Sequence, residues 1–189
     1  MGVMTTMTAR PSPAATPLDL ADAFGAALHV GDTVTALLRG PELRAALVPA
    51  RVVGRDVSGV QLDPLRAGTT LLDGTPVAPG HLISCAPERL VRLDRPARVG
   101  DPFTDWDSIG HFDATDEMLA DGDTVAFALG AGYLGEYSWG RGVITGCTET
   151  MLWVASDADY DTSVFDRFVL AGEQLRIWSP RAVRVGTPA

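Results

Sequence analysis

The stretch Gly31-Asp32-Thr33-Val34 recurs as Gly122-Asp123-Thr124-Val125, 91 residues further along the chain. After both copies the apolar residues stay in step: Val34, Ala36 and Leu38 in the first, and Val125, Phe127 and Leu129 in the second. Alternation of this kind is typical of a strand with one buried face. An internal repeat constrains architecture more strongly than any single motif does. The repeat therefore predicts two copies of one small β unit.

Two further segments extend the repeat. Residues 51–54 are echoed by residues 142–146, with one residue inserted, and residues 87–93 are echoed by residues 172–178. Short apolar runs separated by proline and glycine predict five or six strands in each unit. The predicted strands are Thr33–Leu38, Ala46–Val53, Gly59–Leu62, Thr70–Leu72, Leu82–Cys85, Leu90–Leu93, Thr124–Leu129, Gly140–Thr145, Met151–Ala155, Arg167–Leu170 and Gln174–Trp178.

We expect a short helix before each unit. Thr16 can cap a helix that has Pro17 at its first position, and apolar residues follow at a spacing of three to four up to about His29. Asp113 can cap a second helix that ends near Gly122. The predicted organisation is a flexible arm (1–17), a helix with the first barrel (18–95), an acidic connector with a short helix (96–121) and the second barrel (122–189).

The composition is that of a globular protein with an uneven charge. The chain has 189 residues and a formal net charge of −9, and all 15 of its basic residues are arginine. Residues 1–100 carry 10 arginines and 9 acidic residues, whereas residues 101–189 carry 5 arginines and 15 acidic residues. Because phosphate contacts need cationic groups, the second half is a poor surface for nucleic acid. The absence of lysine is typical of a GC-rich genome, such as that of an actinobacterium or its phage.

Location is predicted from the absence of two signals. No apolar run approaches the ~20 residues of a transmembrane helix, and residues 1–17 lack the apolar core of a signal peptide. We expect no membrane association and a cytoplasmic protein, or a virion protein if a phage encodes it. The two cysteines, Cys85 and Cys147, are expected to be reduced, although a disulfide between the units stays open in an oxidising compartment.

The repeat resembles the SH3-like small barrels, in particular the Tudor, agenet and KOW group. Such domains often begin with a Gly-Asp-x-Val strand, as Gly31–Val34 and Gly122–Val125 do, and continue with a strand similar to Trp139–Ile144. The resemblance implies a mainly β fold of two tandem SH3-like barrels that work as binding or scaffold modules and carry no catalytic residues.

Aromatic residues distinguish the two copies. Residues 30–100 contain no Phe, Trp or Tyr, whereas the second unit contains nine. Tudor-like domains bind methylated basic residues in a cage of aromatic rings, whose faces attract a cation. The predicted partner-binding residues are Tyr133, Tyr137, Trp139 and Tyr160, with Asp157, Asp159 and Asp161 supplying negative charge. The competing interpretation is that Phe127, Trp153 and Trp178 fill the core while the loop tyrosines cover its ends.

Signals for catalysis and metal binding are weak. The Asp157-x-Asp159-x-Asp161 spacing matches the start of a calcium loop, but position 162 is not Gly and position 168 is not Glu. His29, His81 and His111 are scattered, and Ser138 misses the Gly-x-Ser-x-Gly pattern by one residue. We therefore expect no catalytic residue, metal or cofactor.

Three functions are compatible with these sequence features. The favoured one is a non-catalytic interaction or assembly protein, such as an accessory structural component of a phage particle or of a large bacterial complex, with protein partners and possible homo- or hetero-oligomers. The first alternative is a monomeric reader of a basic or methylated peptide, and the second is a small hydrolase-like enzyme.

Overall fold

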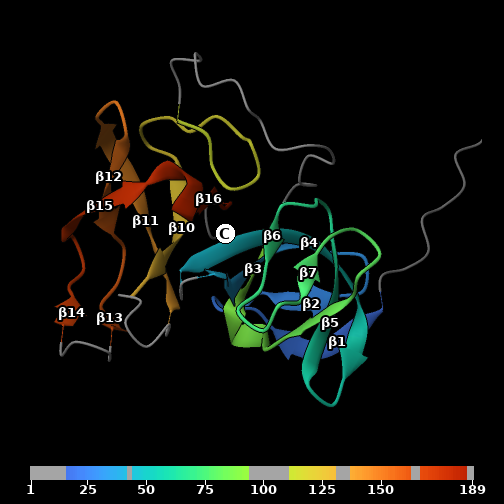
Figure 1. Ribbon diagram of the computed structural model, residues 1–189. Coiled ribbons are helices and arrows are strands. Elements are labelled where there is room, and N and C mark those ends of the chain that lie inside the picture. The colour runs from blue at the N-terminus through green and yellow to red at the C-terminus, as the bar shows by residue number, and fades with distance from the viewer. Residues whose placement is uncertain (1–15, 42–43, 94–110, 131–136, 163–166, 187–189) are drawn as a thin grey trace, which may run out of the picture.

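The protein is mainly β, with its strands gathered in two groups. The computed structural model describes residues 16–41, 44–93, 111–130, 137–162 and 167–186. Figure 1 shows the strands of residues 17–92, coloured blue to green, in one lobe and those of residues 124–184, coloured yellow to red, in another. Nearly all of the predicted arm, residues 96–110 of the predicted connector and Tyr133 lie outside the described residues.

Each lobe contains a five-stranded antiparallel sheet. In the first, the strand order is β8-β5-β4-β3-β9, and in the second it is β15-β12-β11-β10-β16. The first lobe holds β1 (Pro17–Ala21), β2 (Ala27–His29), β3 (Thr33–Arg39), β4 (Ala45–Asp56), β5 (Gly59–Pro64), β6 (Thr69–Thr70), β7 (Pro76–Val77), β8 (Ile83–Cys85), η2 (Pro87–Arg89) and β9 (Leu90–Arg92). The second holds β10 (Thr124–Leu129), β11 (Ser138–Cys147), β12 (Met151–Ser156), β13 (Tyr160–Thr162), β14 (Arg167–Val169), β15 (Gln174–Trp178), η3 (Ser179–Arg181) and β16 (Ala182–Arg184).

The two sheets have the same connectivity. Four strands pair in chain order as a meander, with a separate two-stranded hairpin (β6–β7 or β13–β14) between the third and the fourth. A 3-10 turn comes next, and the fifth strand returns to pair with the first. Equivalent hydrogen bonds close the start of each unit, because the Gly31 amide donates to Val52 O and the Gly122 amide donates to Ile144 O, both at 2.8 Å. The predicted β repeat is therefore present, and its Gly-Asp motif makes the same contact twice.

The predicted pairing of the late segments is wrong. Residues 87–93 were expected to correspond to residues 172–178, but the strand that follows η2 is β9, and its counterpart after η3 is β16. Both β9 and β16 pair with the first long strand of their sheet. The sequence signal for this correspondence is Arg-x-Val-Arg, at Arg89–Arg92 and again at Arg181–Arg184.

Both predicted helices are wrong as well. Residues 17–29 form a hairpin of β1 and β2, and Phe112 makes an antiparallel bridge with Met118. The described residues contain no α-helix. In the predicted helix, Leu18 and Leu28 would lie on one face. In the structure they belong to β1 and β2, which pair with each other, and both side chains are buried, at 6% and 1% exposure. A run of about twelve residues is too short for periodicity alone to decide between helix and hairpin.

A buried aspartate stabilises each of these turns. Asp22 accepts the amides of Phe24 and Ala26 through Oδ1 and that of Arg92 through Oδ2, at 2.7–2.9 Å. Asp113 likewise accepts the amides of Thr115, Glu117 and Arg184. An aspartate that bonds amides two residues onward occurs in turns as well as at helix N-caps, which explains the wrong prediction. In both units the carboxylate ties the entry turn to the last strand.

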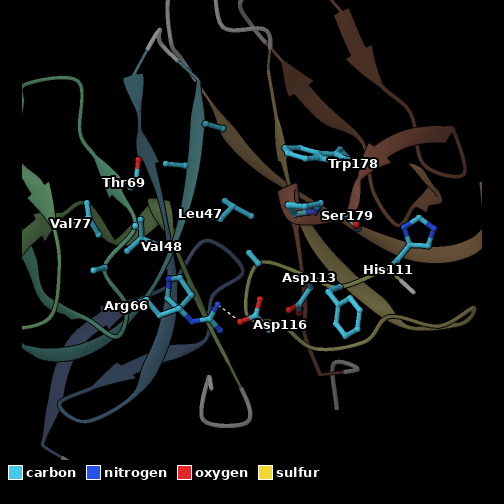
Figure 2. A pocket seen from close by; sticks show the side chains of 18 of the residues that line it. Leu47, Val48, Arg66, Thr69, Val77, His111, Asp113, Asp116, Trp178 and Ser179 are labelled. Carbon is cyan, nitrogen blue, oxygen red and sulfur yellow. Dashed lines mark ion pairs between the residues drawn. The ribbon is translucent and has the colours of Figure 1, made fainter. Parts of the chain in front are cut away.

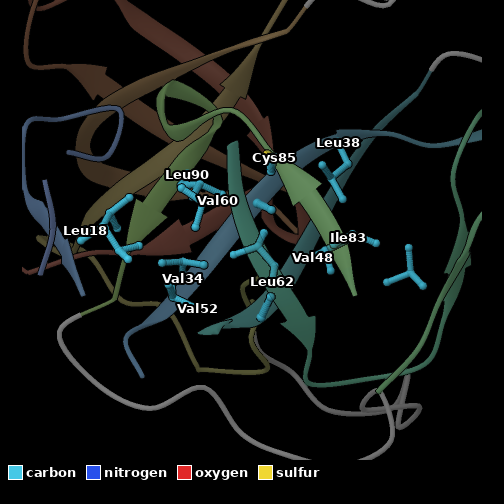
Figure 3. Packing of buried hydrophobic residues seen from close by; sticks show 14 residues of the cluster. Leu18, Val34, Leu38, Val48, Val52, Val60, Leu62, Ile83, Cys85 and Leu90 are labelled. Atoms are coloured by element: carbon cyan, nitrogen blue, oxygen red, sulfur yellow. The ribbon is translucent and has the colours of Figure 1, made fainter. Parts of the chain in front are cut away.

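Each sheet has its own apolar core. The first core, shown in Figure 3, is made of aliphatic side chains and Cys85 and includes Val34, Val52, Leu62 and Leu90 at 0% exposure. The second is built around Phe127, which is also fully buried. The structure thus confirms Phe127 as a core residue. No helix in the described part of the chain is long and apolar enough to cross a membrane.

The buried carboxylates provide a test of the fold. We expect Asp113→Ala to lower the free energy of unfolding by about 2–3 kcal/mol, because several buried amides lose their acceptor. Asp22→Ala should have a similar effect, whereas Asp121→Ala, at an exposed position, should change stability by less than about 0.5 kcal/mol. Urea unfolding of the three variants measures these differences. Equal stability of the Asp113 and Asp121 variants would contradict the assigned role.

Candidate functional site

A third apolar cluster lies between the two sheets. It combines Leu37 and Val91 of the first sheet with Ala126, Trp139 and Val183 of the second. Leu37, Ala126 and Val183 are fully buried. Because the strands of a sheet turn alternate residues to its two faces, these residues come from the face opposite each unit's own core. The two sheets therefore bury their second faces against each other.

Equivalent surfaces of the two units meet in this cluster. Leu37 is paired with Leu47 in the first sheet, and Ala128 is paired with Trp139 at the same place in the second. Leu47 and Trp139 are thus counterparts that pack into one cluster. Such self-complementary contact is what a symmetric dimer interface shows, here formed within a single chain.

The expected exposed patch of Tyr137 and Trp139 is not present. Their side chains are 8% and 5% exposed, because both belong to the cluster between the sheets. The indole Nε1 of Trp139 is buried and has no hydrogen-bond partner among the described residues. The guanidinium of Arg181 lies 6.0 Å from the centre of the Tyr137 ring. These two rings therefore hold the units together and cannot receive a partner from solvent.

Tyr160 and Asp157 form a hydrogen-bonded group with Arg141. The Tyr160 hydroxyl donates to Asp157 Oδ1 at 2.7 Å and accepts the Arg141 amide at 2.9 Å, while the Arg141 side chain pairs with Asp157. The Arg141 guanidinium also lies 5.1 Å from the centre of the Phe24 ring, which belongs to the first unit. Burial, with the hydrogen bond to Asp157 as a second cause, raises the pKa of Tyr160 to about 12.

The remaining predicted site residues are not brought together. Asp159 accepts the Ala171 amide at 2.8 Å, and Asp161 is a residue of β13. Within the described part of the chain, no group of three His, Cys, Asp or Glu residues is placed to hold a metal ion. Partner binding through Tyr160, Asp157, Asp159 and Asp161 stays a prediction.

An open groove lies between the two units. Its volume is about 910 Å³. It is lined by residues 45–49, 66–69 and 77 of the first unit and by residues 111–114, 116, 149–150 and 178–180 from the second half of the chain. Figure 2 shows Leu47 and Val48 on one wall and Trp178 and Ser179 on the wall that faces it. The groove draws its lining from both units, which makes it the candidate binding site.

One ion pair closes the floor of the groove. The Arg66 guanidinium and the Asp116 carboxylate, which are 9% and 12% exposed, pair across the two units. Asp116 sits in the turn whose counterpart contains Gly25, and both residues have positive φ angles, 62° and 83°. Asp tolerates this left-handed conformation better than most residues. The pair therefore joins the second unit's entry turn to the first unit.

The outer wall carries polar and aromatic groups. Nε2 of His111 donates to Thr148 O at 2.6 Å, which holds the entry segment against the β11–β12 turn. Glu149, in that turn, is exposed, and Trp178 is 50% exposed. The interpretation of Trp178 as a core residue is therefore wrong. Trp178 is the last residue of β15 and lines the groove.

Sequence reasoning missed this groove. The competing interpretation places Trp178 in the core, and the sequence pattern assigns residues 46–50 only to a strand. The groove needs both units, so no motif within one unit signals it. The available signal for the groove is two pairs of small residues, Ala45–Ala46 and Ala67–Gly68, which leave space beside β4.

Comparisons with known proteins do not assign the site. Neither the models of protein families nor the curated proteins include a match to this chain. Its function therefore has to be argued from the geometry alone.

The two thiols differ in their surroundings. Cys85 is buried in the first core, and Cys147 is exposed at the end of β11. Burial raises the pKa of the Cys85 thiol to about 12. Since the thiolate is the nucleophile, Cys85 is not activated at neutral pH.

Thiol reactivity tests this assignment. At pH 8 we expect Ellman's reagent to modify Cys147 rapidly and Cys85 only after unfolding in guanidinium, because pH 8 lies far below the pKa of Cys85. Release of two equivalents from the folded protein at equal rates would contradict the burial of Cys85. The Cys147→Ser variant assigns the fast phase.

The burial of Trp139 provides a second test. Trp139→Ala should lower the free energy of unfolding by about 3–5 kcal/mol, because it opens a cavity between the sheets. Trp178→Ala is the matched control, and it should cost at most about half as much because half of that ring is already in solvent. Chemical unfolding followed by circular dichroism gives both values. An equal loss in the two variants would contradict the interface described here.

Proposed function

We propose that this chain is a non-catalytic interaction protein in which two SH3-like barrels act as one binding unit. It serves as an assembly component, such as an accessory structural protein of a phage particle or of a large bacterial complex, in the cytoplasm or the virion. A polypeptide partner binds in the groove between the units.

The strand topology supports the barrel assignment. Each unit has a four-strand meander, a 3-10 turn and a fifth strand that returns to pair with the first, an arrangement that suits a small β-barrel. The Gly31 and Gly122 contacts at the start of both units fit the resemblance noted in the sequence. Because fold does not imply function, the binding role has to rest on the site itself.

One observation carries the binding role: the groove exists only where the two units meet. Its walls come from β4 on one side and from η3 and Trp178 on the other. Ligand sites are commonly found where two units pack together. The burial of the Cys85 thiol gives the hydrolase-like alternative no support at that residue. The alternative of a reader of basic or methylated peptides has less support, because Tyr137 and Trp139, two rings of its expected aromatic patch, are buried.

A blocked groove tests the proposal. Ala67 is exposed and lines the groove, so Ala67→Trp fills it with little effect on the core. The matched control is Ala171→Trp, at an exposed turn residue that does not line the groove. Tagged full-length chains are used to recover partners from the native lysate, and the recovered proteins are quantified by mass spectrometry.

We expect wild type and the Ala171 variant to recover the same proteins in fixed ratio. The Ala67 variant should recover at least about tenfold less, since a filled site excludes the partner's anchoring side chains. Equal recovery by the Ala67 variant would show that the groove is not the binding site. Recovery of no protein by wild type would contradict the interaction role itself.

A further inference from the structure

Half of β4 has an open edge that faces the groove. β3 pairs with β4 over the range from Thr33 with Arg51 to Arg39 with Ala45. β5 covers the other edge only as far as the pair of Ala50 with Pro64, and the Leu65 amide then makes one more bond, to Pro49 O at 2.9 Å. Among the described residues, nothing pairs with Ala45–Val48 on this side.

The pairing register shows which backbone groups face outward. The Gly40 amide donates to Arg44 O at 2.8 Å, so these residues form a hydrogen-bonded pair. Such pairs alternate along an antiparallel ladder. Ala46 and Val48 therefore bond to β3, whereas Ala45 and Leu47 direct their N–H and C=O groups toward the groove. Pro49, which has the same parity, turns its carbonyl to Leu65 and confirms the alternation.

These backbone groups lie where an extended chain has room to pair with them. Ala45 and Leu47 line the groove, and the neighbouring Ala67 and Gly68 are small and exposed. The amides and carbonyls of Ala45 and Leu47 have no protein partner in the described part of the chain. An unpaired strand edge of this kind is a template for another strand. At the counterpart of Pro49 in the second unit, the Arg141 amide is already bonded to the Tyr160 hydroxyl.

The facing wall carries groups that suit a cation. Trp178 is directly paired with Met151, and Glu149 lies two residues before Met151, so the ring and the carboxylate border the same end of the groove. Within the described residues, no cation lies over the Trp178 ring and no ion pair involves Glu149. By contrast, Arg176 covers the ring of Trp153. An exposed indole face beside a carboxylate attracts arginine or lysine.

The charge of the groove points the same way. Arg66 is neutralised by Asp116, and the carboxylate of Asp113 is occupied by backbone amides. Glu149 thus leaves the groove with an uncompensated negative charge. Residues 101–189, which supply this wall, carry 15 acidic residues and 5 arginines. Complementary charge on a partner speeds association and selects against acidic segments.

We propose that an extended, basic segment of the partner binds by adding a strand to the open edge of β4. Its backbone pairs with Ala45 and Leu47, and an arginine or lysine side chain lies against Trp178 and Glu149. In this mode the main-chain hydrogen bonds supply affinity and the side-chain contacts supply selectivity. The inference rests on the proposed function, because it names the kind of segment that the groove accepts.

The probe is a random dodecapeptide library displayed on phage. The full chain is the bait, and Ala67→Trp is used to remove peptides that bind elsewhere. We expect the remaining peptides to carry arginine or lysine and to lack proline in the stretch that pairs with β4, since proline has no N–H for the ladder. The strongest peptide is then labelled with fluorescein and titrated by anisotropy.

Side-chain variants test the cation contact. Trp178→Leu and Glu149→Gln should each weaken binding of the peptide about tenfold, since each removes one attraction for the cation. The controls are Phe168→Leu and Glu88→Gln, at exposed positions that do not line the groove. Both controls should bind like wild type, and replacing the peptide's arginine or lysine by glutamate should abolish binding.

A backbone variant tests strand addition. Ala45→Pro removes one outward N–H but keeps the ladder with β3, because Pro49 already occupies a position of the same parity in β4. We expect this variant to bind the peptide about tenfold more weakly, because one hydrogen bond between the two backbones is lost. Circular dichroism checks its fold, and the Trp178 and Glu149 variants decide the outcome if it fails to fold.

Three results would overturn the inference: no peptide sensitive to the Ala67 variant, enrichment of acidic or uncharged peptides, or equal binding by wild type and the Trp178 variant. The groove would still be the binding site if lysate partners remained sensitive to Ala67→Trp. If those partners were insensitive, the proposed function would fail first. The two failures are therefore distinguishable.

Discussion

The arrangement of this protein depends on the burial of one apolar face of each sheet against the other. Each sheet covers its own core with one face and carries apolar residues on the other, such as Leu37 in the first sheet and Val183 in the second. Exposure of that second face to water would lower the stability of the fold. A single unit of this size also buries too little surface to be more than marginally stable alone. Packing the two units together satisfies both requirements. The groove, the Arg66–Asp116 pair and the contact of Arg141 with Phe24 all exist because the faces meet.

The two units share one set of backbone contacts and differ in their side chains. The carboxylates of Asp22 and Asp113 accept equivalent amides and tie the entry turn to the last strand in both copies. Where the first unit has Gly25, the second has Asp116, which adopts a left-handed conformation that favours glycine. A residue in this conformation costs of order 1 kcal/mol. The carboxylate gained there pairs with Arg66, so the strain is offset by a contact between the units.

Differences between the two units also determine which aromatic residues are buried and which are exposed. Tyr137 and Trp139 occupy the places of Ala45 and Leu47 and fill the contact between the sheets from one side. In the first unit, small residues such as Ala45 and Ala67 leave a space beside β4. Trp178, which immediately precedes η3 in the second unit, borders that space. Tyr137 and Trp139 thus pack against aliphatic residues of the first sheet. The groove lies beside this contact, between β4 and Trp178.

The sequence alone determined the β repeat and most of its strands, because alternation of apolar residues and the Gly-Asp turns are local properties. It also indicated Phe127 as a core residue. It could not determine the entry hairpins, since the apolar spacing of residues 18–28 suits a helix as well and only burial against the core decides between them. Nor could it place Trp139 inside and Trp178 at the surface, because each belongs to a strand, β11 or β15, in which apolar and polar residues alternate in a similar way. That difference comes from the packing of the second faces, a contact between residues about 90 positions apart, and only the tertiary structure brings those residues together.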